Sequence, residues 1–352
     1  MEFLIEYGLF LAKSLTVLVS ILVVIVVIFG STQRQRDPEV GHIEVKNLND
    51  SLEGVTQSLK SIVLNPELLK KDAKEEKKKG KEKYKTQKKD LKQGEGPRPR
   101  MFVVDFVGDV QASEVVNLRE EITAILSVAE DQDEVLVRLE SPGGVVHGYG
   151  LAASQLQRIR NKSVPLTVAV DKVAASGGYM MACIANKIIA APFSLLGSIG
   201  VVAQIPNFHR ILKKNDIDVE ILTAGKYKRT LTLFGENTDR AREKFVDDLE
   251  DVHELFKDFV LDNRPQLDME KVATGEAWFG KRALERDLVD ELKTSDEYIV
   301  DSCANRDVFL VKYVIHKNKI DKIFERVTRL WMGSALSRQT MLQQTLPNQF
   351  IQ

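Results

Sequence analysis

The chain has few cysteines and almost no net charge, and both shortages exclude classes of protein. Its 352 residues include only two cysteines, Cys183 and Cys303, too few for a disulfide framework. Cys183 lies in an apolar run, which favours a buried structural thiol. The formal net charge is −1, so the chain as a whole has no bias toward nucleic acid. We therefore expect no nucleic-acid partner.

Histidines and phosphate-binding loops are scarce as well. Neither Gly-x-Gly-x-x-Gly nor Gly-x-x-x-x-Gly-Lys-Ser/Thr occurs, which argues against a nucleotide site. Of five histidines, only His147 lies near a glycine-rich motif. A histidine base needs a third residue to orient it, and no Asp partner is evident for His147. We interpret His147 as a structural or substrate-lining side chain.

One long stretch without charge stands near the N-terminus. Residues 14–30 (SLTVLVSILVVIVVIFG) carry no charge, and with residues 9–13 they reach the ~20 residues that a membrane-spanning helix needs. A cleaved signal peptide is the alternative, but Glu2 and Glu6 stand where such a peptide carries positive charge. The sequence therefore predicts an uncleaved membrane anchor over residues 1–33.

Residues 34–100 read as a stalk and a linker. Apolar side chains in residues 47–63 alternate at spacings of four and three, which is typical of a stalk helix or a short coiled-coil contact. Residues 70–100 are rich in lysine with interspersed acids, as in a solvated linker. Docking of this stretch on anionic lipid headgroups is the alternative.

A globular region follows over residues 101–316, where predicted strands alternate with predicted helices. This alternation predicts an α/β fold with a parallel core. Residues 317–352 form an amphipathic segment and a tail, suited to a membrane surface, another subunit or a plain terminal helix. The expected strands are 101–110, 134–139, 165–170, 187–191 and 219–222, and the expected helices are 112–130, 148–161, a short helix just past Ser176, and 238–264.

Small residues around Ser176, in Ala-Ala-Ser-Gly-Gly, suggest an exposed hydroxyl at the start of a helix. Free backbone N–H groups and the helix dipole favour a developing oxyanion there. A plain N-cap serine is the alternative. Gly143 and Gly144 follow the strand 134–139, and their N–H groups could point at a carbonyl oxygen. An ordinary strand-to-helix turn has the same composition.

A serine nucleophile needs a base, and a lysine can serve where burial penalises its ammonium form. In Gly-Lys-Tyr-Lys, both Lys226 and Lys228 are candidates on pattern alone. An exposed loop lysine is the alternative. Ser198, in Gly-Ser-Ile-Gly, could hydrogen-bond such an amine and orient it.

Four motifs stand in a fixed order: Ser-Pro-Gly-Gly, Ala-Ser-Gly-Gly-Tyr, Gly-Ser-Ile-Gly-Val and Gly-Lys-Tyr-Lys. Together they resemble the signal peptide peptidase A family over residues 101 to about 315. With the anchor and the lysine-rich linker, the chain looks most similar to the SohB branch of bacterial inner-membrane proteases. The resemblance implies a Clp protease/crotonase-like fold of repeated β-β-α units. It also implies that no metal or other cofactor is needed.

The resemblance further implies a Ser/Lys catalytic dyad. Ser176 matches the family's nucleophile, and Lys228, the second lysine of its motif, matches the general base. Ser198 matches the serine that contacts this base.

The same resemblance implies where the oxyanion is bound. Gly143 falls at the position of an oxyanion donor, and the N–H of Gly177 would be the second donor. Gly144 would be a further oxyanion or substrate contact.

These roles describe a membrane-anchored serine endopeptidase that cleaves signal peptides or other membrane-associated or unfolded segments. Family members assemble into rings or domes, so we expect a homo-oligomer held to the lipid bilayer by the N-terminal helix. The family places its catalytic domain outside the cytoplasm, whereas Arg34, Arg36 and Lys46 after the anchor favour the cytoplasmic side. Two alternatives are a catalytically silent membrane scaffold on the same fold and a crotonase-like acyl-CoA enzyme.

Overall fold

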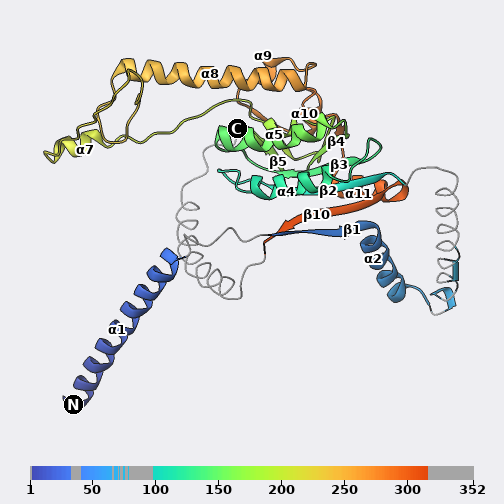
Figure 1. Cartoon of the computed structure of the whole chain (residues 1–352), viewed down its shortest axis with the longest axis horizontal. Coiled ribbons are helices and arrows are strands. Elements are labelled where there is room, and N and C mark those ends of the chain that lie inside the picture. The colour runs from blue at the N-terminus through green and yellow to red at the C-terminus, as the bar shows by residue number, and fades with distance from the viewer. Residues whose placement is uncertain are drawn as a thin grey trace. The chain divides into compact units, whose positions relative to one another are not determined.

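The computed structural model describes residues 2–32, 41–65 and 98–315, and the positions 67–69, 71, 74, 75 and 78. The chain divides into two units (Figure 1). One comprises Met1–His42 with Val314–Gln352, and the other comprises Ile43–Tyr313. The predicted C-terminal segment 317–352 and most of the lysine-rich linker lie outside the described residues.

The N-terminal stretch forms one helix, α1 (Glu2–Thr32). Among the described residues, no helix combines the length and the apolar character needed to cross a membrane. The single-pass anchor predicted over residues 1–33 is therefore not supported by the structure.

The second unit is built on a seven-stranded sheet in the order β1-β10-β2-β3-β4-β6-β9. The pairs from β10 to β9 in this order are all parallel. In β3, Val135, Leu136 and Val137 are all fully buried, so both faces of the sheet are covered, as is usual for parallel strands. The α/β prediction is confirmed. The strands are β1 (His42–Asn47), β2 (Arg100–Val107), β3 (Glu134–Glu140), β4 (Leu166–Val170), β6 (Lys187–Ala190), β9 (Glu291–Leu292) and β10 (Asp307–Val314).

Different helices pack on the two faces of this sheet. On one face, α4 (Val115–Leu126), α5 (Val146–Asn161) and α6 (Gly177–Ala182) supply the larger core cluster. On the other, α11 (Ser295–Asn305) and the start of α2 (Leu48–Val63) cover a smaller cluster. The buried cysteine predicted from the sequence, Cys183, lies in the larger cluster, where burial raises the pKa of its thiol.

A second sheet of three short strands carries the turns of the candidate site. It consists of β5 (Val173–Ala175), β7 (Leu195–Gly197) and β8 (Ala277–Phe279) in that order. β5 pairs with β7 in parallel, and β7 pairs with β8 in antiparallel orientation. The chain passes from β4 of the large sheet to β5 of the small one and then into α6. It passes a second time from the large sheet to the small one, from β6 to β7.

Beyond β7 the chain leaves the sheets as an arm, residues 201–238, that carries α7 (His209–Lys214) and extends away from them in Figure 1. The strand predicted at 219–222 is wrong, because these residues lie in irregular backbone within the arm and pair with no strand among the described residues. The chain returns through α8 (Asp239–Asn263), whose N-cap Thr238 accepts from Ala241 N–H. Two short helices follow, α9 (Met269–Val272) and α10 (Gly280–Leu284).

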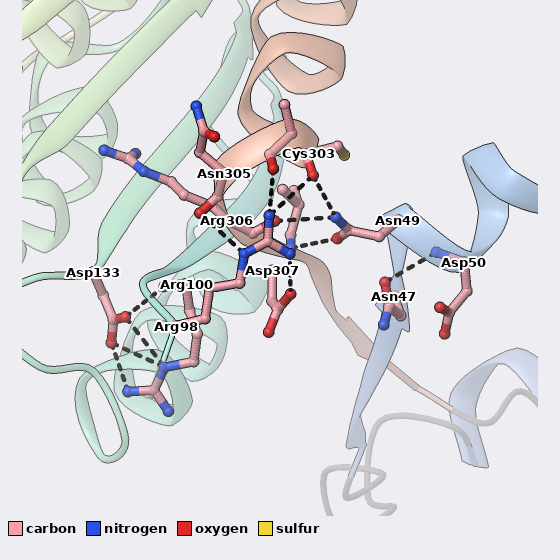
Figure 2. A network of polar contacts seen from close by, with 12 residues as sticks. Asn47, Asn49, Asp50, Arg98, Arg100, Asp133, Cys303, Asn305, Arg306 and Asp307 are labelled. Atoms are coloured by element: carbon pink, nitrogen blue, oxygen red, sulfur yellow. Dashed lines mark hydrogen bonds and ion pairs between the residues drawn. The ribbon is translucent and has the colours of Figure 1, made fainter. Parts of the chain in front are cut away.

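Figure 2 shows how the segment before the lysine-rich linker is fixed to the end of α11. Asn49 of α2 donates to the carbonyls of Cys303 and Arg306 at 3.1 and 3.0 Å, and accepts from Val308 N–H at 2.7 Å. Arg98 donates to further carbonyls at this helix end. The last carbonyls of a helix have no partner inside it, so these bonds satisfy them. α2 thus shares one unit with the α/β domain.

Candidate active site

Ser176 lies at the sharp turn between the end of β5 and the start of α6. Its backbone angles are φ 52° and ψ −119°, a strained conformation for a residue with a side chain. In α/β-hydrolases a strained strand-to-helix turn of this kind exposes the nucleophilic serine. Ser176 itself is half-buried.

The small sheet places Ser198 beside Ser176. Ala175 of β5 is paired with Gly197 of β7, and each serine follows its member of this pair. The N–H of Ser176 donates to the Gly197 carbonyl at 2.8 Å, and Ser198 N–H donates to the Glu276 carbonyl at 2.7 Å. The two serines that the sequence assigned to one site are therefore held side by side by backbone pairing.

The turn after β3 brings the predicted oxyanion residues to the same place. A Cβ built on Gly143 would lie 2.8 Å from the Ser176 Cβ and 2.9 Å from the Gly177 nitrogen. Gly143 also has φ 92°, so only glycine fits here without strain. By contrast, a Cβ on Gly144 would lie 2.1 Å from the Val110 carbonyl oxygen, so this residue packs against the segment after β2.

Two buried residues that the sequence analysis did not single out stand behind this turn. Ser141 Oγ accepts from Gly143 N–H at 3.1 Å and lies 2.5 Å from Tyr149 Oη. The Ser-Pro-Gly sequence carried a usable signal, because a serine hydroxyl often accepts from the N–H two residues on. The Gly143 amide is therefore already hydrogen-bonded in this structure.

Lys228 is not brought to Ser176. Its side chain is exposed on the arm, and its N–H donates to the Gly225 carbonyl at 3.2 Å. Among the described residues no contact joins Lys228 to Ser176 or to Ser198. Its neighbour Lys226 lies over the Tyr227 ring at 5.0 Å. Within one chain Ser176, Ser198 and Gly143 therefore come together, and Lys228 makes no described contact with them.

Two histidines, one on α5 and one on α8, are the other candidate bases. His147 is exposed, and His253 of α8 has its Nε2 3.2 Å from the carbonyl oxygen of Ile199, the residue after Ser198. Neither histidine contacts Ser176 in the described part of the chain. In the same part, no group of three or more His, Cys, Asp or Glu residues is placed to hold a metal ion.

Comparison with protein families matches nearly the whole chain to one family. Residues 2–156 match the model described as Peptidase family S49 N-terminal, and residues 158–308 match that described as Peptidase family S49. The chain belongs to peptidase family S49. The family supports peptidase activity, and the resemblance inferred from the four motifs is confirmed.

Relatives in this family include "Probable protease SohB" of Haemophilus influenzae, 51% identical over 325 residues that cover 91% of this chain and 92% of the relative. The protein of the same description from Buchnera aphidicola subsp. Schlechtendalia chinensis is 50% identical over 304 residues, covering 85% and 99%. "Serine protease SPPA, chloroplastic" of Arabidopsis thaliana is 33% identical over 174 residues, covering 48% of this chain and 26% of the relative. These relatives support a serine protease.

Among solved structures, the chain is similar to a mutant of the "1510-N membrane-bound stomatin-specific protease" in complex with a substrate peptide. The TM-score is 0.41 and the identity 14%, with 66% of this chain and 99% of that chain covered.

Proposed function

We propose that the chain is a serine endopeptidase in which Ser176 is the nucleophile and Lys228 the general base. The observation that carries this proposal is the convergence of Ser176, Gly143 and Gly177 at one strained turn. A strained turn is retained when function needs it, and here it exposes a hydroxyl beside two backbone donors. Family membership supports peptide-bond hydrolysis as the reaction.

Each of these residues has a separate role in the hydrolysis. Ser176 Oγ attacks the peptide carbonyl while its proton passes to the neutral amine of Lys228, and the carbonyl oxygen becomes an oxyanion. The N–H groups of Gly143 and Gly177 stabilise that charge. The lysine then gives its proton to the leaving amine, and the acyl-enzyme ester is hydrolysed by water activated in the same way. Ser198 orients the lysine through a hydrogen bond.

We propose that the dyad is completed between subunits. Lys228 is exposed and makes no contact with the Ser176 of its own chain among the described residues, yet a lysine loses its proton readily only where it is covered. The arm that carries it exposes large apolar residues, and Arg229, Leu231 and Phe234 help to line a cavity of about 510 Å³ on it. An apolar surface of this kind suits a second copy of the chain. Self-association would cover the arm and bring the amine to a neighbouring Ser176.

The fold and the setting of the enzyme are further parts of the proposal. The passage from a strand of the large sheet to one of the small sheet, made twice, supports the Clp protease/crotonase type. The substrates are signal peptides or other membrane-associated or unfolded segments, because an extended segment is needed to reach the strand-to-helix turn at Ser176. A membrane location, with the catalytic domain outside the cytoplasm, rests on the uncharged sequence 14–30 and on the resemblance.

The test is peptide cleavage by the full-length protein, wild type beside Ser176→Ala, Lys228→Ala and Lys226→Ala. We expect the first two to abolish cleavage, Lys226→Ala to retain it, and the wild-type rate to rise with pH as an amine loses its proton. Mixing the two inactive variants restores part of the activity if the dyad spans subunits. Full activity in Ser176→Ala would refute the proposal.

A catalytically silent scaffold is the second candidate, and the separation of Lys228 from Ser176 within one chain is the observation that favours it. It predicts no cleavage by the wild type, and no restoration of activity in the mixture. Such a result with correctly assembled protein would replace the peptidase proposal.

A further inference from the structure

A buried chain of polar groups ends on the proposed oxyanion donor. The hydroxyl of Tyr149, on α5, donates to the Asp109 carbonyl at 2.8 Å and lies 2.5 Å from Ser141 Oγ. Ser141 Oγ in turn accepts from the N–H of Gly143 at 3.1 Å. The side chains of Ser141 and Tyr149 are fully buried, so water does not compete for these bonds. Tyr149, six residues after Gly143, therefore fixes the direction of the Gly143 N–H through Ser141.

Each hydroxyl of this hydrogen-bond network has a single acceptor. A phenol carries a single proton, and a carbonyl oxygen only accepts. The Tyr149 hydroxyl therefore donates its hydrogen bond to the Asp109 carbonyl, and the Ser141 hydroxyl donates to Tyr149 Oη. The lone pairs of Ser141 Oγ then remain for the N–H of Gly143. The network is complete, and it uses the Gly143 amide.

An amide N–H has one proton, so it does not serve Ser141 and an oxyanion together at good geometry. We propose that Ser141, ordered by Tyr149, is a positioning residue that holds the Gly143 amide in a resting direction. The Pro142–Gly143 peptide rotates during catalysis and turns this N–H toward the oxyanion. The inference rests on the proposed function, in which Gly143 is an oxyanion donor.

The local backbone permits this rotation. Gly143 has φ 92°, and a glycine reaches other φ values at little cost. The start of the turn stays fixed, because Ser141 N–H donates to the Val173 carbonyl at 2.8 Å and its carbonyl accepts from Ala175 N–H at 3.0 Å. The hydrogen bond to Ser141 favours the resting direction of the Gly143 amide by about fivefold, because rotation breaks it. The Ser141 hydroxyl thus slows the enzyme modestly.

Tyr149 has a second contact that the test must keep separate. A Cβ on Gly177 would lie 2.4 Å from Tyr149 Cγ, so the ring packs directly under the other proposed donor. Tyr149→Phe removes the hydroxyl and preserves this packing. Ser141→Ala removes the acceptor of the Gly143 amide. Ser141→Ala therefore removes the bond to Gly143 N–H directly, and Tyr149→Phe weakens it through Ser141.

The first measurement is the rate at which a fluorophosphonate probe labels Ser176 in the full-length protein. We expect Ser141→Ala to raise this rate about fivefold and Tyr149→Phe to raise it by less. Ser154→Ala and Tyr298→Phe are matched controls: Ser154 is an exposed residue of α5 and Tyr298 bonds Glu134, and both should keep the wild-type rate. A gain in rate is not expected from a purely structural role of Ser141.

The second measurement follows the amide itself. Pro142–Gly143 is the only Pro-Gly pair in the sequence, so labelling proline carbonyl with ¹³C and glycine with ¹⁵N gives a single NMR signal for this peptide. We expect the signal to shift on phosphonylation, and the free Ser141→Ala protein to exchange this amide proton faster than wild type.

Two results would overturn this inference alone. One is an NMR signal that does not shift when the wild type is labelled by the probe. The other is a Ser141→Ala variant with an unchanged melting temperature that is labelled at the wild-type rate or more slowly. No labelling of Ser176 in wild type or in any variant would overturn the proposed function, and this inference with it.

Discussion

Ser176 and Ser198 occupy equivalent places one residue beyond a pair of parallel strands, and both have φ 52°. Positive φ costs energy for a residue with a side chain, and the pairing of Ala175 with Gly197 supplies the support. The chain thus holds the two serines side by side just beyond the ends of β5 and β7.

Gly143→Ala should destabilise the site. The new Cβ would lie 2.8 Å from both the Ala175 carbonyl oxygen and the Ser176 Cβ, at φ 92°, and we expect a loss of about 1–3 kcal/mol with loss of activity. Gly150→Ala is the matched control, because nothing lies within 4 Å of its Cβ on helix α5. That change should stabilise the protein by about 0.5–1 kcal/mol. Urea unfolding of both variants measures the contrast, and equal effects would contradict it.

Ser198→Ala should lower kcat by about 10-fold with little change in KM, because a hydroxyl that orients a base acts on the chemical step. Ser198→Gly separates chemistry from backbone: it also lacks the hydroxyl but relieves the positive φ. We expect both variants to have the same low kcat and the glycine variant to melt at a higher temperature. Steady-state kinetics and calorimetry check this, and full activity in either variant would remove the role proposed for Ser198.

Asp290→Asn should cost about 3 kcal/mol, because it leaves the buried Arg264 guanidinium without its ionic partner. Arg264 donates twice to the Asp290 carboxylate, both bonds at 2.8 Å. Burial raises the pKa of Asp290, but these bonds and the N–H of Ile188 hold it below the ordinary 3.8.

A lowered pKa means that the stabilisation is present above pH 3.8 and is lost as pH falls through the lower, folded-state value. Unfolding of wild type and Asp290→Asn between pH 2 and 6 measures this loss, which the variant should lack. Arg242→Ala, which breaks an exposed pair with Asp239, is the control and should change nothing measurable.

Stability should fall as pH rises because of Glu121 on α4. Burial raises the pKa of its carboxyl to about 7, and the negative charges of Glu114 and Asp105 also raise it. The hydrogen bond from Tyr313 N–H and the positive charge of Lys312 lower it. One of its oxygens has no hydrogen-bond partner among the described residues.

A raised pKa means that the folded protein holds this proton more tightly than the unfolded chain, so stability falls between pH 4.5 and about 7. The loss reaches at most about 3 kcal/mol. Glu121→Gln should flatten this dependence, whereas Glu120→Gln, an exposed neighbour, should keep it. Unfolding curves at pH 5 and pH 8 decide the matter, and a wild-type curve that is flat over this range would contradict the prediction.

The elements read from periodicity were predictable, and those set by distant pairing were not. The charged helix 238–264 is confirmed as α8, because its capping threonine and apolar stripe are local signals. β5 and β7 have three residues each, too few for a pattern, and they exist because they pair with each other. The apolar residues 219–222 looked like a strand, but Val219 and Ile221 line the cavity on the arm.

The candidate site divides in the same way. Small residues around Ser176 predicted a strand-to-helix turn, and the structure confirms the turn. No local signal could place Lys228, because its partner depends on contacts outside its own segment. The bond from Gly143 N–H to Ser141 had a local signal in Ser-Pro-Gly, but the contact of Ser141 with Tyr149 on α5 had none. The roles of these residues remain predictions.

The position of β10 has a consequence for the newly made chain. This strand is synthesised after every other strand of the large sheet, yet it lies between β1 and β2. Until residues 307–314 leave the ribosome, β2 presents an open edge and the sheet is unfinished. The domain around Ser176 is therefore finished only after residues 307–314 have left the ribosome, so no peptidase activity is expected before that point.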